Sequence, residues 1–229
     1  ANALMTLIAG MKDADGHIQL PGFYDKVRSL DDEERVQLAR LPMKEEFFLK
    51  QTGSPALWGE KGYTPVEHVG ARPTLDVNGM LSGFTGEGAK TVLPAKAMAK
   101  ISMRLVPDQT PDEVYLQLKE YMEKNTPEGV SWDIKIEHGG NPSISEMDGI
   151  GVRAMAKAFK DVWGVDPLFK REGGSIPVVG NMQDILGMES VLTGFGLPDD
   201  RIHSPNEKQD LPTWYRGIDA LIHFFYNLR

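Results

Sequence analysis

The chain has 229 residues, and its 41% hydrophobic content is sufficient for one large domain or two small ones. Its 33 acidic residues outnumber its 25 basic residues, and the net charge of -8 argues against binding to nucleic acid. The absence of cysteine excludes disulfides, cysteine-ligated zinc and a thiol nucleophile, and no apolar run reaches the roughly 18 residues that a membrane span needs.

The first 72 residues predict a helix, a charged helical stretch and a loop. Apolar residues at helical spacing predict a helix over 4–11, which the Asp-Gly pair at 15–16 ends before an extended segment at 18–22. Because the chain opens inside this helix, we expect further polypeptide before it. Acidic residues open the stretch 29–50, where a helix dipole favours them, and predict one or two helices. The glycines and prolines of 53–72 predict a loop.

The middle of the chain predicts a β-α-β unit. Small or apolar residues alternate with polar ones over 97–105, which is typical of a strand with one exposed face. The Thr-Pro-Asp-Glu sequence at 110–113 supplies an N-cap, a first-turn proline and an acid at the third helical position, and so predicts the start of a helix. A second alternating run at 130–137 predicts a second strand. Helices on one side of such a sheet predict a small two-layer domain that ends near 139–142.

The composition changes after Ser145, and we expect a second domain from there. An apolar stripe over 152–163 predicts a helix that ends at Gly164, and residues 190–193 predict a strand. A final helix follows Asp210, and its large apolar residues are expected to face a core. They are Trp214, Ile218, Leu221, Ile222 and Phe225.

A pair of glycines marks the first candidate for chemistry. Gly173 and Gly174 allow a sharp turn, after which Ser175 as N-cap and Pro177 in the first turn predict a helix. The free N–H groups of such a helix start can hold a carboxylate, for example the C-terminus of a peptide. The alternative is a well-capped helix without a ligand. The neighbouring Glu172 is either an anchor for a substrate amine or a solvated acid.

Three further segments have a chemical interpretation. His203 is a candidate metal ligand because it lies on a loop after the predicted strand, although a lone histidine is more often a surface or core residue. Arg104, on the polar face of its strand, is a receptor for a carboxylate or a solvated charge. The run 83–91 resembles a phosphate-binding loop only in part, because Ala89 separates Lys90 from the preceding glycine, and we reject nucleotide binding.

Four segments act as motifs, and they are Gly86 to Pro94, Ser102 to Pro107, Arg171 to Pro177, and His203 to Lys208. In this order they resemble the dinuclear zinc exopeptidases of the carnosinase and cytosolic nonspecific dipeptidase type, which are related to aminoacylase and succinyl-diaminopimelate desuccinylase. The resemblance covers nearly the whole chain. It implies an α/β fold overall, with a two-layer α+β lid (dimerisation) domain at residues 1–143, lacking its first strand, followed by a partial α/β zinc-peptidase catalytic domain at 144–229.

The resemblance also implies roles for individual residues. His203 matches the last zinc ligand of a site that holds two Zn²⁺ in the complete enzyme. Arg104 matches a lid residue that holds the terminal carboxylate of the substrate, and Thr91 one that reaches in from a neighbouring subunit. Glu172, Gly174 and Ser175 match substrate-pocket positions. Such enzymes are homodimers that cleave a small peptide or an acyl-amino acid with a metal-activated water.

The chain departs from this family because it lacks the family's N-terminal half. The other zinc ligands and the glutamate that acts as general base have no counterpart here, so no catalytic residue is assigned. A zinc site needs at least three protein ligands, and we therefore expect the isolated chain to be inactive and to bind no stoichiometric zinc. Helices at 148–163 and 212–228 would lose apolar partners, which predicts self-association.

Two alternatives differ from an enzyme portion. One is a non-catalytic dimerisation module, which has no need for Glu172, Ser175 or His203. The other is a serine hydrolase that uses Ser175, which we reject because no Gly-x-Ser-x-Gly elbow is present. The sequence favours the enzyme portion. The lack of cysteine is compatible with a reducing cytosol, and we expect a cytoplasmic protein.

Overall fold

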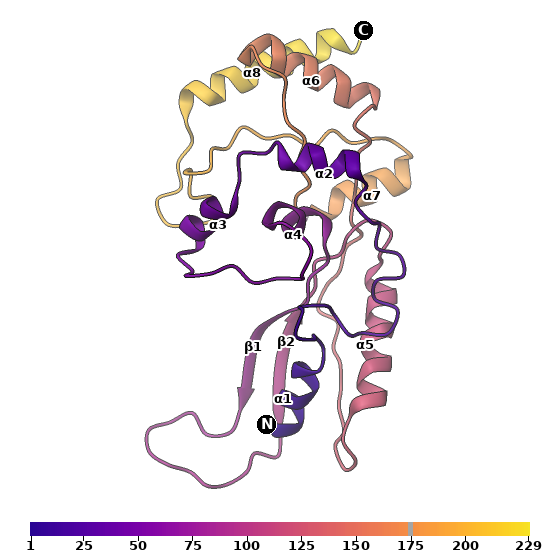
Figure 1. Cartoon of the computed structure of the whole chain (residues 1–229), viewed down its shortest axis with the longest axis vertical. Helices are drawn as coiled ribbons and strands as arrows, with labels where there is room; N and C mark the ends of the chain where they lie inside the picture. Colours follow the sequence, from indigo (N-terminus) through magenta and orange to yellow (C-terminus); the bar gives the residue numbers. More distant parts are fainter. Residues whose placement is uncertain (174–175) are drawn as a thin grey trace. The chain divides into compact units, whose positions relative to one another are not determined.

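The computed structural model describes residues 1–173 and 176–229, which fold into two compact units. The mixture of helices and strands agrees with the predicted α/β class (Figure 1). Among the described residues, every helix is too short or too polar to span a bilayer. Residues 1–142 and 170–177 form unit 1, whereas residues 143–169 and 178–229 form unit 2.

Unit 1 contains the sheet. Helix α1 (Asn2–Ala9) confirms the helix that the apolar spacing predicts at the start of the chain. Strands β1 (Asp76–Ser82) and β2 (Ala97–Ser102) pair antiparallel. β2 confirms the predicted alternation, because Ile101 is half-buried between exposed neighbours. The sequence does not predict β1, because an asparagine and a glycine interrupt its alternation, and the register shifts next to Gly79.

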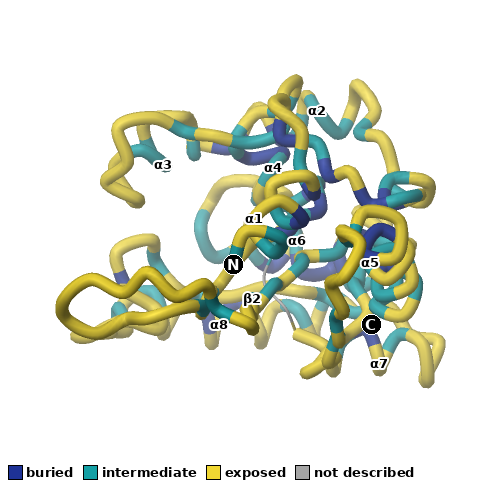
Figure 2. The backbone as a smooth tube through the Cα atoms, turned by 90° about the horizontal axis from the view of Figure 1, so that it is seen from below, coloured by how far each residue is buried: buried dark blue, intermediate teal, exposed yellow. Residues whose placement is uncertain are grey.

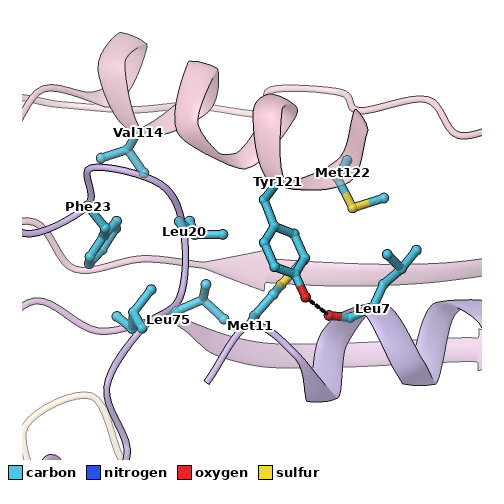
Figure 3. Close-up of a cluster of buried hydrophobic side chains, with 9 residues drawn as sticks. Leu7, Met11, Leu20, Phe23, Leu75, Val114, Tyr121 and Met122 are labelled. Atoms are coloured by element: carbon cyan, nitrogen blue, oxygen red, sulfur yellow. Dashed lines mark hydrogen bonds between the residues drawn. The ribbon is translucent and has the colours of Figure 1, made fainter. Parts of the chain in front are cut away.

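The core of unit 1 joins α1 to α5 (Pro111–Asn125), which begins as predicted. The Thr110 hydroxyl accepts a hydrogen bond from the Glu113 backbone N–H at 3.4 Å. The Tyr121 hydroxyl donates a hydrogen bond to the Leu7 carbonyl at 2.8 Å, which ties the two helices together (Figure 3). The buried residues of this core are Leu7, Met11, Ile18, Leu20, Phe23, Leu75, Val114, Tyr121 and Met122.

The prediction of a second strand at 130–137 is wrong, although part of the segment packs as expected. Trp132 and Ile134 are partly buried against the core of unit 1. Val130 and Ile136 are instead exposed, and this fully described segment forms no ladder with a neighbouring strand. Alternation therefore predicts which side chains face the core, but a strand also needs a hydrogen-bonded neighbour.

Two helices form over the charged stretch 29–50, as predicted. Helix α2 (Asp32–Ala39) begins after Asp31, whose carboxylate accepts a hydrogen bond from a first-turn backbone N–H at 2.8 Å. Helix α3 (Glu45–Thr52) ends at Gly53, which has a φ of 67°. Glycine adopts this left-handed conformation without strain, so it ends the helix cleanly.

The prediction of a loop over 53–72 is wrong for the last part of this range, where helix α4 (Pro65–Ala71) forms. The Thr64 hydroxyl accepts a hydrogen bond from the Glu67 backbone N–H at 3.4 Å. In return the Glu67 carboxylate accepts one from the Thr64 N–H at 2.6 Å. This capping box stabilises a helix start in the Thr-Pro-Val-Glu sequence, but the glycines and prolines around it favour a loop when sequence alone is considered.

Unit 2 is organised around the contact between α6 (Ile150–Trp163) and α8 (Leu211–Asn227). As predicted, α6 ends at Gly164. The two helices approach through small side chains, because Ala158 on α6 and Ala220 on α8 are both 0% exposed. A larger side chain at either position would overpack this contact.

The predicted orientation of α8 is wrong. Its small residues Gly217 and Ala220 are buried, so the small face, rather than the large apolar face, packs in unit 2. The large residues are between 40% and 66% exposed in the described part of the chain. They are Trp214, Ile218, Leu221, Ile222 and Phe225.

The rest of unit 2 is less regular than predicted. Helix α7 (Pro177–Leu186) has Pro177 in its first turn, as predicted, whereas the predicted N-cap Ser175 lies outside the described residues. The strand predicted at 190–193 is wrong, because these residues, all of them described, form no ladder. The Ser190 carbonyl instead accepts a hydrogen bond from the Ser145 hydroxyl.

Candidate active-site segments

Thr91 lies on the long loop that joins β1 to β2. All residues from 83 to 93 are exposed, and the tube of Figure 2 shows this hairpin loop in yellow. Within it the Lys90 ammonium lies over the Phe84 ring, 5.5 Å from the centroid. Strand β2, rather than a helix, follows the loop, which agrees with the rejection of a phosphate-binding loop. Thr91 is therefore accessible to a partner molecule.

Arg104 lies beyond the other end of β2. Its backbone is held by Thr74, whose N–H donates to the Arg104 carbonyl at 3.0 Å and whose hydroxyl accepts from the Arg104 N–H at 3.4 Å. The Arg104 residue is exposed, as the alternation predicts. The six residues of β2 separate it from the hairpin loop. At about 3.3 Å per residue the strand is on the order of 20 Å long, so Thr91 and Arg104 lie at opposite ends of it.

The segment around Glu172 belongs to unit 1, although the chain on both sides of it belongs to unit 2. Glu172 is exposed and forms an ion pair with Lys170. Gly173 contacts helix α4 of the same unit, as described below. Gly174 and Ser175 lie outside the described residues, and their proposed part in a substrate pocket stays a prediction.

His203 lies on an exposed turn after α7. It has a φ of 63°, and its backbone N–H donates to the Glu207 carboxylate at 3.4 Å. The turn is closed by a hydrogen bond from the Ser204 N–H to the Arg201 carbonyl at 2.9 Å. The imidazole is thus presented at the surface of unit 2 from a locally ordered loop.

Asp200 organises this loop and was not identified from the sequence. Its carboxylate is 1% exposed and accepts hydrogen bonds from the Leu197 N–H and the Lys208 ammonium, both at 2.7 Å. The Leu197 N–H, followed by Lys208, holds the pKa of Asp200 below its ordinary value of 3.8. No local pattern signals this role, because Lys208 lies eight residues further along the chain.

We expect the loop around His203 to loosen at acidic pH. Because the pKa of Asp200 is lower in the folded state, its stabilising contribution is present above pH 3.8 and is lost as the pH falls through the lowered value. The amide proton of Leu197, measured by NMR, should shift upfield over that window. In Asp200→Asn this transition should disappear. A transition of the wild-type amide centred at or above about pH 5 would contradict the assignment.

The described residues do not form a metal site by themselves. Nowhere in 1–173 or 176–229 do three or more His, Cys, Asp or Glu side chains cluster in a way that could hold a metal ion. A zinc site requires at least three protein ligands, so His203 does not suffice. His203 belongs to unit 2, whereas Thr91, Arg104 and Glu172 belong to unit 1, and their convergence stays a prediction.

Comparison with known proteins places these segments in a family context. A model of the peptidase dimerisation domain matches residues 1–130. The Cys-Gly metallodipeptidase DUG1 of Candida albicans is 33% identical over 97% of the chain, and the human Beta-Ala-His dipeptidase is 28% identical over 98%. These matches cover 47% and 45% of the two relatives, so the chain spans about half the length of the curated relatives it matches.

Solved structures agree with the sequence matches. The chain superposes on an M20 family metallo-carboxypeptidase from Sulfolobus solfataricus with a TM-score of 0.87 at 29% identity, over 99% of this chain and 52% of that one. It superposes on human carnosine dipeptidase 1 with a TM-score of 0.77 at 27% identity, over 99% of this chain and 48% of that one. These neighbours support the α/β class. Because the model of the peptidase dimerisation domain matches more than half of this chain, the chain belongs to the M20 peptidase family.

Proposed function

We propose that this chain is the C-terminal portion of a zinc-dependent dipeptidase or amidohydrolase that cleaves a peptide or amide bond with a metal-activated water. The main support is that the similarity to Cys-Gly and Beta-Ala-His dipeptidases extends over 97–98% of the chain, including the segments of Arg104, Glu172 and His203. Residues 1–143 would be the lid and 144–229 the end of the catalytic domain. The remaining zinc ligands and the general base would come from polypeptide outside this chain.

In this proposal His203 is a ligand of one of two Zn²⁺ ions. Its exposure on a loop fixed by Asp200 supports the role, because the imidazole can meet ligands that another polypeptide segment supplies. Zinc at such a site polarises the scissile carbonyl and lowers the pKa of a bound water. Within this chain, the His203 imidazole would bind the metal ion, and the hydrogen bonds of Asp200 would fix the conformation of the loop that carries it.

In a dimer, Arg104 of one protomer and Thr91 of its partner would bind the same substrate molecule. The guanidinium of Arg104 can bind the terminal carboxylate of a small peptide or an acyl-amino acid through two hydrogen bonds. Thr91 and Arg104 lie at opposite ends of β2, which supports the idea that one chain does not bring both to one substrate. The exposed hairpin loop could carry Thr91 into the site of a neighbouring subunit.

Metal analysis and peptide hydrolysis test the proposal. The isolated chain should hydrolyse neither Cys-Gly nor β-Ala-His and should retain less than one zinc per chain after dialysis. When the ligand-bearing half of an M20 dipeptidase precedes it in one polypeptide, hydrolysis should appear and should be abolished by His203→Ala. Hydrolysis or stoichiometric zinc in the isolated chain would contradict the proposal, as would an active fusion that His203→Ala leaves unchanged.

A non-catalytic dimerisation module remains the second candidate, because the dimerisation-domain model matches residues 1–130. Both candidates predict a dimer, but only the enzyme needs the segments of Glu172 and His203. If the fusion described above dimerises but never hydrolyses a dipeptide or an acyl-amino acid, the module is the better description.

We expect the isolated chain to self-associate. The large apolar face of α8, with Trp214 and Phe225 exposed by 51% and 66%, forms part of a surface that soluble monomers rarely leave bare. Light scattering at micromolar concentration should give at least twice the chain mass of 25.4 kDa. Phe225→Asp should lower the association, whereas Arg216→Asp, at an exposed position of the same helix outside the large apolar face, should not. A 25.4 kDa species for the unaltered chain would contradict this expectation.

A further inference from the structure

Two glycines bring the segment of Glu172 against helix α4. A Cβ built on Gly70 would lie 2.4 Å from the Cβ of Arg171 and 2.6 Å from its carbonyl carbon. A Cβ built on Gly173 would lie 2.6 Å from the carbonyl oxygen of Val69. Real Cβ atoms do not approach other atoms so closely, so a side chain at either glycine would push the segment away from the helix. The contact therefore depends on the absence of side chains at both positions.

An ion pair fixes the same segment to helix α2. The Arg171 guanidinium contacts the Glu34 carboxylate, and the two side chains are only 19% and 20% exposed. Glu34 lies in the first turn of α2, where the helix dipole favours its negative charge. Partial burial reduces solvent screening of this pair, so it orients Arg171 more firmly than a surface pair would.

Helices α2 and α4 are themselves joined by a buried carboxylate. Glu67 on α4 is 3% exposed and accepts a hydrogen bond from Arg35 on α2 at 2.8 Å. The same carboxylate closes the capping box with Thr64. The two helices thus form one support for residues 170–173.

We infer that α2 and α4 act as a platform that positions the substrate-binding segment at Glu172, and that Glu34 and Gly70 are positioning residues for it. The inference rests on the proposed function, because that proposal gives Glu172 its role toward the substrate. The unit 1 assignment of this segment supports the platform, since Arg171 and Gly173 belong to the unit of α2 and α4, which they contact, although the chain on both sides belongs to unit 2.

Hydrogen exchange measured by mass spectrometry on the whole 229-residue chain tests the platform. Gly70→Ala should speed exchange of the 169–173 amides by about tenfold, although alanine normally favours a helix, while amides of α5 stay unchanged. Gly194→Ala is the matched control, because no atom lies within 4 Å of a Cβ built there. Unchanged exchange at 169–173 in Gly70→Ala would overturn the inference.

A double-mutant cycle tests the ion pair independently of Gly70. Glu34→Gln and Arg171→Gln should each speed exchange of the 169–173 amides, and the double variant should exchange no faster than the faster single variant. Additive effects would show that the two residues act separately and would contradict the positioning role of Glu34. A fold-wide rise in exchange for any of these variants would also count against a local role.

Binding of glycylglycine separates the platform from the proposed function. An NMR titration of the fusion of the ligand-bearing half with this chain, followed at the Gly173 amide, should show weaker binding in Gly70→Ala and Glu34→Gln than in the wild type and in Gly194→Ala. Equal binding in all four would overturn positioning toward substrate. If the wild-type fusion shows no binding while the exchange results hold, the substrate role of the segment fails and the platform stands.

Discussion

Replacing Phe23 with alanine is expected to lower the free energy of unfolding by about 3–5 kcal/mol, the usual cost of deleting a buried aromatic side chain. Phe23 is 2% exposed and lies in the core shared by α1 and α5 (Figure 3). Its ring packs edge-on against Tyr24 with centroids 5.3 Å apart. Its carbonyl also accepts a hydrogen bond from Gln109, which fixes the loop that carries it. The substitution would leave a cavity that this well-tied loop cannot close.

Denaturant unfolding followed by tryptophan fluorescence measures this effect. Phe84→Ala is the matched control, because Phe84 lies on the exposed hairpin loop and should change stability by no more than about 0.5 kcal/mol. An equal effect of the two substitutions would show that the core of unit 1 does not limit the stability of the chain.

The helices were the most predictable part of this fold. Thr110, Gly164 and the proline at 177 each mark a helix end through local backbone chemistry, and each prediction is confirmed. Local signals failed where neighbouring composition opposed them, as at the capping box of Thr64. Strand pairing depends on partners far along the chain, so the alternation at 130–137 predicted a strand that does not form.

The orientation of α8 shows a second limit of sequence analysis. Its large apolar face is the natural candidate for burial, yet the buried residues of α8 are Gly217, which faces the Phe195 ring, and Ala220. Both faces of such a helix are apolar, and periodicity alone does not decide which one meets a given neighbour. In the proposed function the exposed face would be covered by polypeptide outside this chain.

The candidate site was predictable as motifs but not as a set of contacts. His203 and Glu172 were identified from their segments, whereas Asp200, Glu34 and Gly70 were not. Each residue that was missed has a partner that lies between 8 and 137 positions away in the chain. No short motif encodes such pairs, so only coordinates reveal them.

Replacing Arg72 with alanine is expected to cost about 3 kcal/mol of stability, because removal of one partner leaves the other as an uncompensated, largely buried charge. Arg72 donates two hydrogen bonds to Glu60, at 2.8 and 2.7 Å, and the two side chains are 9% and 12% exposed. Its guanidinium also lies over the rings of Tyr24 and Tyr63. Burial alone would lower the pKa of Arg72, but Glu60 raises it above its ordinary value, so the guanidinium stays charged.

Arg72 follows α4, so its loss also tests how far the platform depends on this buried pair. Thermal unfolding should show a clear fall in stability for Arg72→Ala and a smaller one for Arg72→Lys, which keeps the charge but loses the paired hydrogen bonds. Arg40→Ala is the control, because Arg40 is exposed and its guanidinium donates a hydrogen bond to the side chain of the nearby Gln37 rather than to a buried carboxylate. If Arg72→Ala is as stable as Arg40→Ala, the Glu60 carboxylate must gain water when Arg72 is lost. The pair would then be a surface ion pair in solution, and α4 would hold the segment of Glu172 without it.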